Sequence, residues 1–150
     1  MWGKVLVGLC LVCTLSCTTL QSPPPTTYLI PQRNPWDCGL AVVAMLAGRT
    51  YEDVESVAVD KGIYVDISMG MYDANMVDLA KEYGVILTPR SFIDYDKDEG
   101  ILHIVWVMTG VHHFIYLKGG YLYDPLERLP TYHKYGRMGW NLVKFFKRNP

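Results

Sequence analysis

Apolar residues in the first part of the chain recur at helical spacing. Residues 38–48, CGLAVVAMLAG, are apolar almost all round, so they predict a buried helix that ends at its last glycine. Asp37 precedes this stretch, and we expect it to cap the helix by accepting hydrogen bonds from the first-turn amides. Thr50 followed by Asp53 is typical of a capping box and predicts a second short helix. Residues 68–84 carry apolar side chains at helical spacing and predict a third.

The pattern changes near residue 85, where β-branched and aromatic runs separated by turn residues begin. Helices followed by strands predict an α+β domain in which N-terminal helices lie on a C-terminal antiparallel sheet. The basic and aromatic tail, residues 133–148, fits either a last strand or a short helix. The runs typical of strands occupy residues 85–89, 101–109, 112–118 and 121–125.

The first 27 residues have the composition of a targeting segment and a tether. A single lysine precedes an apolar run of eleven residues, too short to span a bilayer and typical of a secretory signal. The sequence TLSC, ending at Cys17, resembles the bacterial lipobox, which implies lipidation of that cysteine. Residues 18–27 are rich in Thr, Ser and Pro and favour an extended tether. We therefore expect a signal peptide of the lipoprotein type over residues 1–17 and a folded domain over residues 28–150, exported and anchored to the membrane.

Composition narrows the class of protein. A chain of 150 residues suffices for one domain with a real core, and a net charge of -1 gives no general attraction to nucleic acid, so we expect no nucleic-acid partner. Cys38 is the only cysteine in residues 28–150. An exported domain with one thiol has no internal disulfide partner, so that thiol is either a buried apolar residue or a nucleophile.

The position of Cys38 favours chemistry at its thiol. At the first turn of a helix, the helix dipole and the free amide groups both favour a thiolate over a thiol. A cysteine nucleophile also needs a base to hold its proton and an acceptor that orients the base. Gln32 lies six residues before Cys38 and could donate to an oxyanion together with a backbone N–H at the helix start; alternatively it is a solvated loop residue.

Two adjacent histidines precede a predicted hairpin turn. His112 and His113 point to opposite faces of a strand, so only one of them can face a given site. Gly119-Gly120 predicts a two-residue turn in which paired residue numbers sum to 239, so His113 faces Leu126 and has Asp124 as a diagonal neighbour on the same face. The turn selects His113 with Asp124 and places His112 on the other face.

The remaining histidines receive structural interpretations. His103 lies in an apolar run and is expected to be a hydrogen-bonded sheet residue, while His133 lies in the basic tail and is expected at the surface. The histidines and the single domain cysteine show no zinc-type spacing, so we expect no metal and no cofactor.

Taken together, these motifs resemble the papain-like cysteine peptidases of the bacteriocin-processing group, members of which cut leader peptides after a double glycine, often as a domain fused to an export transporter. The resemblance covers residues 28–126 and implies a papain-like fold, with the helix before the sheet. Its motifs are Gln32, Asp37-Cys38-Gly39, His113-Phe114 and Asp124-Pro125.

The resemblance also implies roles for these residues. Cys38 would attack a peptide carbonyl, His113 would take and return the proton, Asp124 would orient His113, and Gln32 would stabilise the oxyanion. We expect a standalone exported form that acts on a peptide or protein substrate, and the sequence assigns no oligomeric state. Two alternatives remain: a lipoprotein that binds peptides in the same cleft without cutting them, and a transamidase or cell-wall peptide amidase on the same fold.

Overall fold

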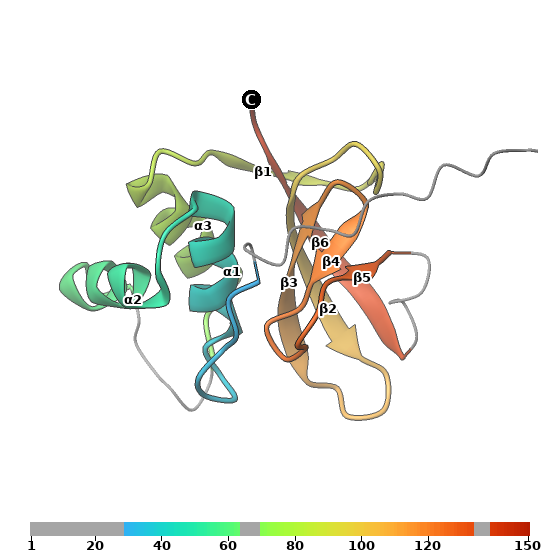
Figure 1. Ribbon diagram of the computed structural model, residues 1–150, viewed down its shortest axis with the longest axis horizontal. Coiled ribbons are helices and arrows are strands. Elements are labelled where there is room, and N and C mark those ends of the chain that lie inside the picture. Colours follow the sequence, from blue (N-terminus) through green and yellow to red (C-terminus); the bar gives the residue numbers. More distant parts are fainter. Residues whose placement is uncertain (1–28, 64–69, 134–138) are drawn as a thin grey trace, which may run out of the picture.

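The computed structural model of the chain describes residues 29–63, 70–133 and 139–150 (Figure 1). The expected signal peptide over residues 1–17, with its lipid site, and the expected tether over residues 18–27 lie outside the described residues and stay predictions. Within the described ranges, none of the helices combines the length and the apolar character needed to cross a membrane.

Three helices form where the apolar pattern predicts them. The first, α1 (Cys38–Ala47), is buried along almost its whole length and ends at Gly48, whose φ of 64° is the left-handed conformation that glycine adopts readily. The Thr50 side chain accepts a hydrogen bond of 3.2 Å from the Asp53 backbone N–H, as a helix N-cap does. The other two helices are α2 (Tyr51–Asp60) and α3 (Asp73–Glu82).

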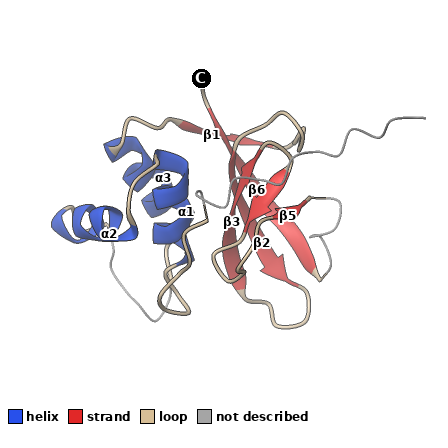
Figure 2. Cartoon of the chain, in the orientation of Figure 1, coloured by secondary structure: helices blue, strands red, loops and turns tan. Residues whose placement is uncertain are grey.

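The strands form one antiparallel sheet. In spatial order the strands run β1-β6-β2-β3-β4-β5, and each neighbouring pair is antiparallel. Figure 2 shows the helices gathered on one side of the molecule and the sheet on the other. The predicted α+β class, with helices packed on an antiparallel sheet, is therefore confirmed. The strands are β1 (Leu87–Arg90), β2 (Gly100–Trp106), β3 (His112–Lys118), β4 (Tyr121–Tyr123), β5 (Thr131–Tyr132) and β6 (Trp140–Arg148).

The two faces of the sheet bury different clusters. On the helix side, Phe114 and Tyr116 of β3 join the core that α1 fills, while Ile115 and Leu117 of the same strand belong to a cluster on the opposite face. This alternation is the period of two that a strand imposes on its side chains. α1 lies beside β3 (Figure 1). Cys38, the first residue of that helix, interacts with His113 near the start of the strand.

The tail forms a strand rather than a helix. β6 lies between β1 and β2, and its adjacent Phe145 and Phe146 are buried on opposite faces of the sheet. A strand with apolar residues on both faces has no clear alternation in its sequence, so hydrophobic periodicity alone does not distinguish it from a short helix. The sheet also gains β5, which the sequence did not predict because two residues are too short to give a pattern.

The expectation that His133 lies at the surface is wrong. Its side chain is buried, its ring stacks on Tyr95 with centroids 5.0 Å apart, and its Nε2 lies 3.1 Å from an Asp96 carboxylate oxygen. The segment that carries these two partners folds over the end of β5, and no local pattern around His133 signals that cover.

Candidate active site

Cys38 is the first residue of α1 and lies just below the surface, with 6% of its area exposed. The backbone carbonyl of Asp37 accepts hydrogen bonds from the amides of Leu40 (3.0 Å) and Ala41 (3.3 Å). Among the described residues, no acceptor pairs with the backbone N–H of Cys38 or of Gly39. Free amides at a helix N-terminus stabilise negative charge, so this end of α1 is suited to a thiolate or an oxyanion.

The prediction that the Asp37 side chain caps α1 is wrong. Asp37 occupies the N-cap position, but its fully buried carboxylate turns back and accepts from the Asn34 backbone N–H (3.0 Å), the Asn34 side-chain amide (3.2 Å) and the Arg33 backbone N–H (3.3 Å). The Tyr51 hydroxyl donates to the same oxygen. The carboxylate therefore organises the loop before the helix and leaves the backbone N–H groups of Cys38 and Gly39 free for the site.

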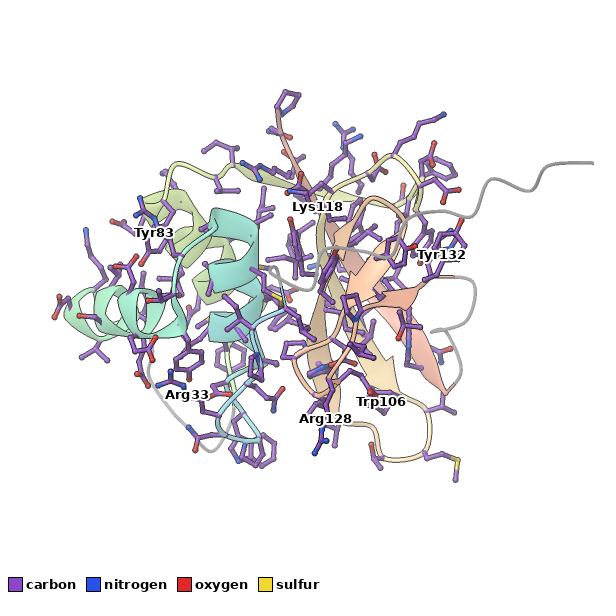
Figure 3. All side chains as sticks on the ribbon, viewed as in Figure 1. Arg33, Tyr83, Trp106, Lys118, Arg128 and Tyr132 are labelled. Carbon is purple, nitrogen blue, oxygen red and sulfur yellow. The ribbon has the colours of Figure 1, made fainter. Side chains whose placement is uncertain are left out.

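A second contact fixes this loop to the helix layer. The Arg33 guanidinium lies 4.3 Å from the centroid of the Tyr51 ring and forms an ion pair with Glu52. In Figure 3, Arg33 lies on the helix side of the molecule. Tyr51 is thus held at both its ring and its hydroxyl, and it links the loop before Cys38 to α2.

Gly39 allows a close approach at the site. A Cβ atom on this residue would lie 2.8 Å from the Cβ and Sδ atoms of Met71, which is closer than real contacts allow. The segment that leads into α3 therefore reaches the start of α1 because residue 39 has no side chain.

The hairpin of β3 and β4 has the predicted register. Lys118 pairs with Tyr121 and Tyr116 with Tyr123, so the sum of 239 is confirmed, and Gly119 and Gly120 have the positive φ values of 57° and 82° that such a turn requires.

The hairpin brings Asp124 to His113. β4 ends at Tyr123, so the predicted pairing of His113 with Leu126 does not form, and the Leu126 backbone N–H instead donates to Asp124 Oδ1 at 2.9 Å. The same carboxylate oxygen lies 2.7 Å from His113 Nε2. A carboxylate fixed by the backbone therefore holds one edge of a histidine ring that is only 4% exposed.

The other partner of His113 is Cys38. Burial by itself lowers the pKa of His113, but hydrogen bonds with the Asp124 and Cys38 side chains outweigh it and raise the pKa to about 9. Since Nε2 contacts Asp124, the second ring nitrogen, Nδ1, is left to face the thiol. The structure thus joins a thiol, an imidazole and a carboxylate in series, with the protonated imidazole stabilised.

Gln32 approaches the site from the loop. Its backbone N–H donates to the Pro125 carbonyl at 3.1 Å, which ties the loop to the residue after Asp124. Its side-chain Nε2 donates to the Asn34 carbonyl at 2.8 Å, and this bond uses one of its two N–H groups. Among the described residues, no hydrogen-bond partner reaches its buried Oε1.

A pocket of about 270 Å³ opens at Cys38. His112 lines it, so the prediction that this residue cannot share the site is wrong. His112 and His113 point to opposite faces of the strand, but both lie at the start of β3, near the start of α1. His112 lines the pocket there, and His113 interacts with the Cys38 thiol. The rest of the lining is largely apolar and comes from Pro35, Trp36, Met71, Val111 and Phe114.

Larger hollows lie elsewhere on the molecule, near β1 and β6. Two of them measure about 500 and 580 Å³, and charged side chains such as Lys97 and Lys147 line both, with no cysteine or histidine in their walls. In the part of the chain that the structure describes, no group of three or more His, Cys, Asp or Glu side chains is arranged to hold a metal ion. Of the hollows described, the pocket at Cys38 is therefore the one lined by a cysteine and a histidine.

Comparison with known proteins gives one structural likeness. No family model matches the chain, and no curated protein matches it. Among solved structures, the chain is similar to one described as a double glycine motif protease from an AMS/PCAT transporter in complex with the leader peptide, with 24% sequence identity and a TM-score of 0.48. The likeness covers 81% of this chain and 91% of that one. It does not assign an activity, so a function has to be argued from the geometry at Cys38.

Proposed function

We propose that the protein is a cysteine peptidase that hydrolyses peptide bonds with Cys38, His113 and Asp124. The observation that carries this proposal is the buried imidazole of His113, which lies 2.7 Å from the Asp124 carboxylate and whose pKa the Asp124 and Cys38 side chains together raise to about 9 despite burial. An ordinary buried cysteine needs neither a proton acceptor nor an oriented imidazole, whereas a nucleophile needs both.

In the first half of the reaction, the Cys38 thiol gives its proton to Nδ1 of His113. The Asp124 carboxylate accepts from Nε2–H and stabilises the imidazolium that forms. The thiolate attacks the peptide carbonyl carbon and a C–S bond forms. When the tetrahedral intermediate collapses, the C–N bond breaks, the imidazolium protonates the leaving amine, and a thioester remains on Cys38.

In the second half, a water molecule attacks the thioester. His113 takes the water proton, a new C–O bond forms and the C–S bond breaks. The proton returns to the departing thiolate, and the carboxylic acid product leaves. The same imidazole acts as base and acid in turn, which suits a ring whose neutral and charged forms are both held in place.

The negative charge on the carbonyl oxygen needs donors in both halves. The Cys38 backbone N–H has no acceptor among the described residues, and the Gln32 amide keeps one N–H beyond its bond to Asn34. We assign these two groups to the oxyanion, since free donors fixed before the reaction stabilise charge that develops in the transition state.

The pocket limits the substrate. Its lining of Trp36, Met71 and Phe114 suits a small or apolar side chain next to the cut bond. We propose leader peptides with a double glycine, the substrates that the resemblance of the motifs implies, as candidates for this space.

Alkylation of Cys38 tests the proposal. Iodoacetamide is added to the full chain at pH 5 to 9, and mass spectrometry of the peptide that contains residue 38 gives the rate. We expect rapid alkylation at pH 6, where an ordinary thiol with a pKa of about 8.5 reacts slowly, and a loss on the order of 100-fold in His113→Ala.

His112→Ala is the matched control for this experiment, since it removes the neighbouring histidine and should leave the rate within about twofold. Slow alkylation of the unaltered chain at pH 6, or equal losses in the two variants, would refute the proposal.

A further inference from the structure

A second series of side chains ends at the same pocket. Asp73, the first residue of α3, places Oδ1 2.7 Å from Nδ1 of His103 on β2. Nε2 of His103 lies 2.8 Å from Nδ1 of His112, the first residue of β3. Three elements thus converge on the ring of His112, which lines the pocket at Cys38.

Lys144 and the Phe114 ring pack around Asp73 and His103, and the surroundings set the pKa of His103. Lys144 of β6 lies 3.0 Å from the second carboxylate oxygen of Asp73, and the Phe114 ring packs against His103 with centroids 4.9 Å apart. Burial is the largest influence on the pKa of His103 and lowers it. With the smaller lowering effects of His112 and Lys144, burial outweighs the Asp73 carboxylate, which raises the pKa. His103 is therefore neutral at neutral pH.

The neutral state of His103 fixes where the protons are. Its Nδ1 lies 2.7 Å from Asp73 Oδ1, although the contact does not have the angles of a hydrogen bond. Two lone pairs this close would repel, so the hydrogen belongs on Nδ1, and Nε2 has a lone pair and can only accept. His112 Nδ1 must then be the donor in the bond between the rings. In the imidazole tautomer with its hydrogen on Nδ1, Nε2 keeps a lone pair, so in this tautomer His112 Nε2 is a hydrogen-bond acceptor.

We propose that His112 is a substrate-binding residue whose Nε2 accepts a hydrogen bond from a backbone N–H of the peptide in the pocket, with Asp73 and His103 as the positioning residues that fix its tautomer. This inference rests on the proposed function, because the same pocket must hold the peptide that Cys38 attacks. It adds a polar contact to a pocket whose other walls are largely apolar.

The ring orientation supports a role beyond solvation. His112 is exposed, and an exposed histidine gains little stability from one hydrogen bond. Here its ring is held by a series that runs through two other elements and ends at a carboxylate. Fixing a ring before the ligand arrives reduces the entropy lost on binding.

Two electrophiles separate peptide binding from thiol chemistry. Iodoacetamide reports only the reactivity of Cys38, whereas an acetyl-Leu-Gly-Gly chloromethyl ketone must also bind as a peptide before it alkylates. For His112→Phe we expect the inactivation constant KI of the peptide reagent to rise about fivefold or more, the loss of one hydrogen bond, with its maximal rate and the iodoacetamide rate within twofold. His112→Gln keeps an acceptor oxygen and should recover part of the affinity.

A variant that never touches the peptide tests the tautomer. In Asp73→Asn the amide oxygen faces Lys144, which can only donate, so the amide N–H faces His103. This moves the ring hydrogen of His103 to Nε2 and turns His112 Nε2 into a donor. KI should rise as in His112→Phe, and nitrogen-15 spectra should show His112 Nε2 changing from unprotonated to protonated. Asp78→Asn, the same change at an exposed position of α3, is the control and should leave both readings unchanged.

The outcomes separate the two proposals. Slow iodoacetamide alkylation of the unaltered chain would remove the proposed function and this inference together. Rapid iodoacetamide alkylation with an unchanged KI in His112→Phe would overturn the inference alone. An Asp73→Asn protein with unaltered KI and unaltered His112 nitrogen signals would overturn the positioning roles.

Discussion

His112 and His113 are adjacent in the chain, and each is linked to a carboxylate, directly for His113 and through His103 for His112, but their surroundings differ. His113 is buried, touches Asp124 directly and faces the thiol of Cys38. His112 is exposed and reaches Asp73 only through His103. The comparison teaches that a histidine's chemistry follows from what each ring nitrogen meets. One ring is stabilised in its charged form beside a nucleophile, and the other lies at a pocket with its Nδ1 2.8 Å from a second histidine.

The largest expected difference between the two histidines is in the alkylation rate of Cys38 when each linked carboxylate is removed. Asp124→Ala takes away the group that stabilises the His113 imidazolium, and we expect the alkylation rate of Cys38 at pH 6 to fall on the order of 100-fold. Asp73→Ala should change that rate less than twofold, because its series ends at His112. Equal losses in the two variants would mean that both histidines serve the thiol.

The second largest expected difference is in how each histidine contributes to the pH dependence of the free energy of unfolding. The pKa of His113 is about 9 in the folded chain, above the value near 6.5 expected when unfolded. The folded state therefore binds this proton more tightly, so the stabilisation is complete below about pH 6.5 and is lost as the pH rises through about 9. We expect the free energy of unfolding to fall by a few kcal/mol between these values.

The variants show which histidine causes that fall. His113→Phe should flatten the dependence measured by urea unfolding at several pH values, while His112→Phe should keep it. A slope that persists in His113→Phe would assign the effect to another group.

The turn that brings Asp124 to His113 gives the smallest predicted effect. Gly119→Ala and Gly120→Ala both force a side chain into the left-handed region, at a cost of about 1–2 kcal/mol. An added Cβ at Gly120 would also lie 2.9 Å from the Tyr132 ring, whereas Gly119 faces open space, so Gly120→Ala should unfold at the lower temperature. If the two variants melt together, the contact with Tyr132 does not restrain the turn.

Local patterns in the sequence predicted the parts of the site that are set by interactions between residues close together in the chain. The glycine pair fixed the register of β3 and β4, and strand alternation within a few residues placed His113 and Asp124 on one face. The apolar run and its final glycine placed α1, and with it the thiol at a helix start. These features follow from backbone geometry over about ten residues.

The features that the sequence did not predict depend on contacts between distant elements. The Asp37 carboxylate accepts from the Tyr51 hydroxyl rather than from the amides of its own helix, and Asp73 at the start of α3 lies 2.7 Å from His103 of β2, thirty residues away. The tail became β6 because its place between β1 and β2 is set by pairing across the whole sheet. Spacing along the chain carries no signal for such contacts.

The most direct measurement of the central claim is a nitrogen-15 titration of the His113 ring from pH 5 to 10. The account predicts that both ring nitrogens stay protonated until a midpoint of about 9, and that Cys38→Ala lowers this midpoint because one of the two groups that raise the pKa is lost. A midpoint near pH 6.5 in the unaltered chain, unchanged in Cys38→Ala, would contradict it.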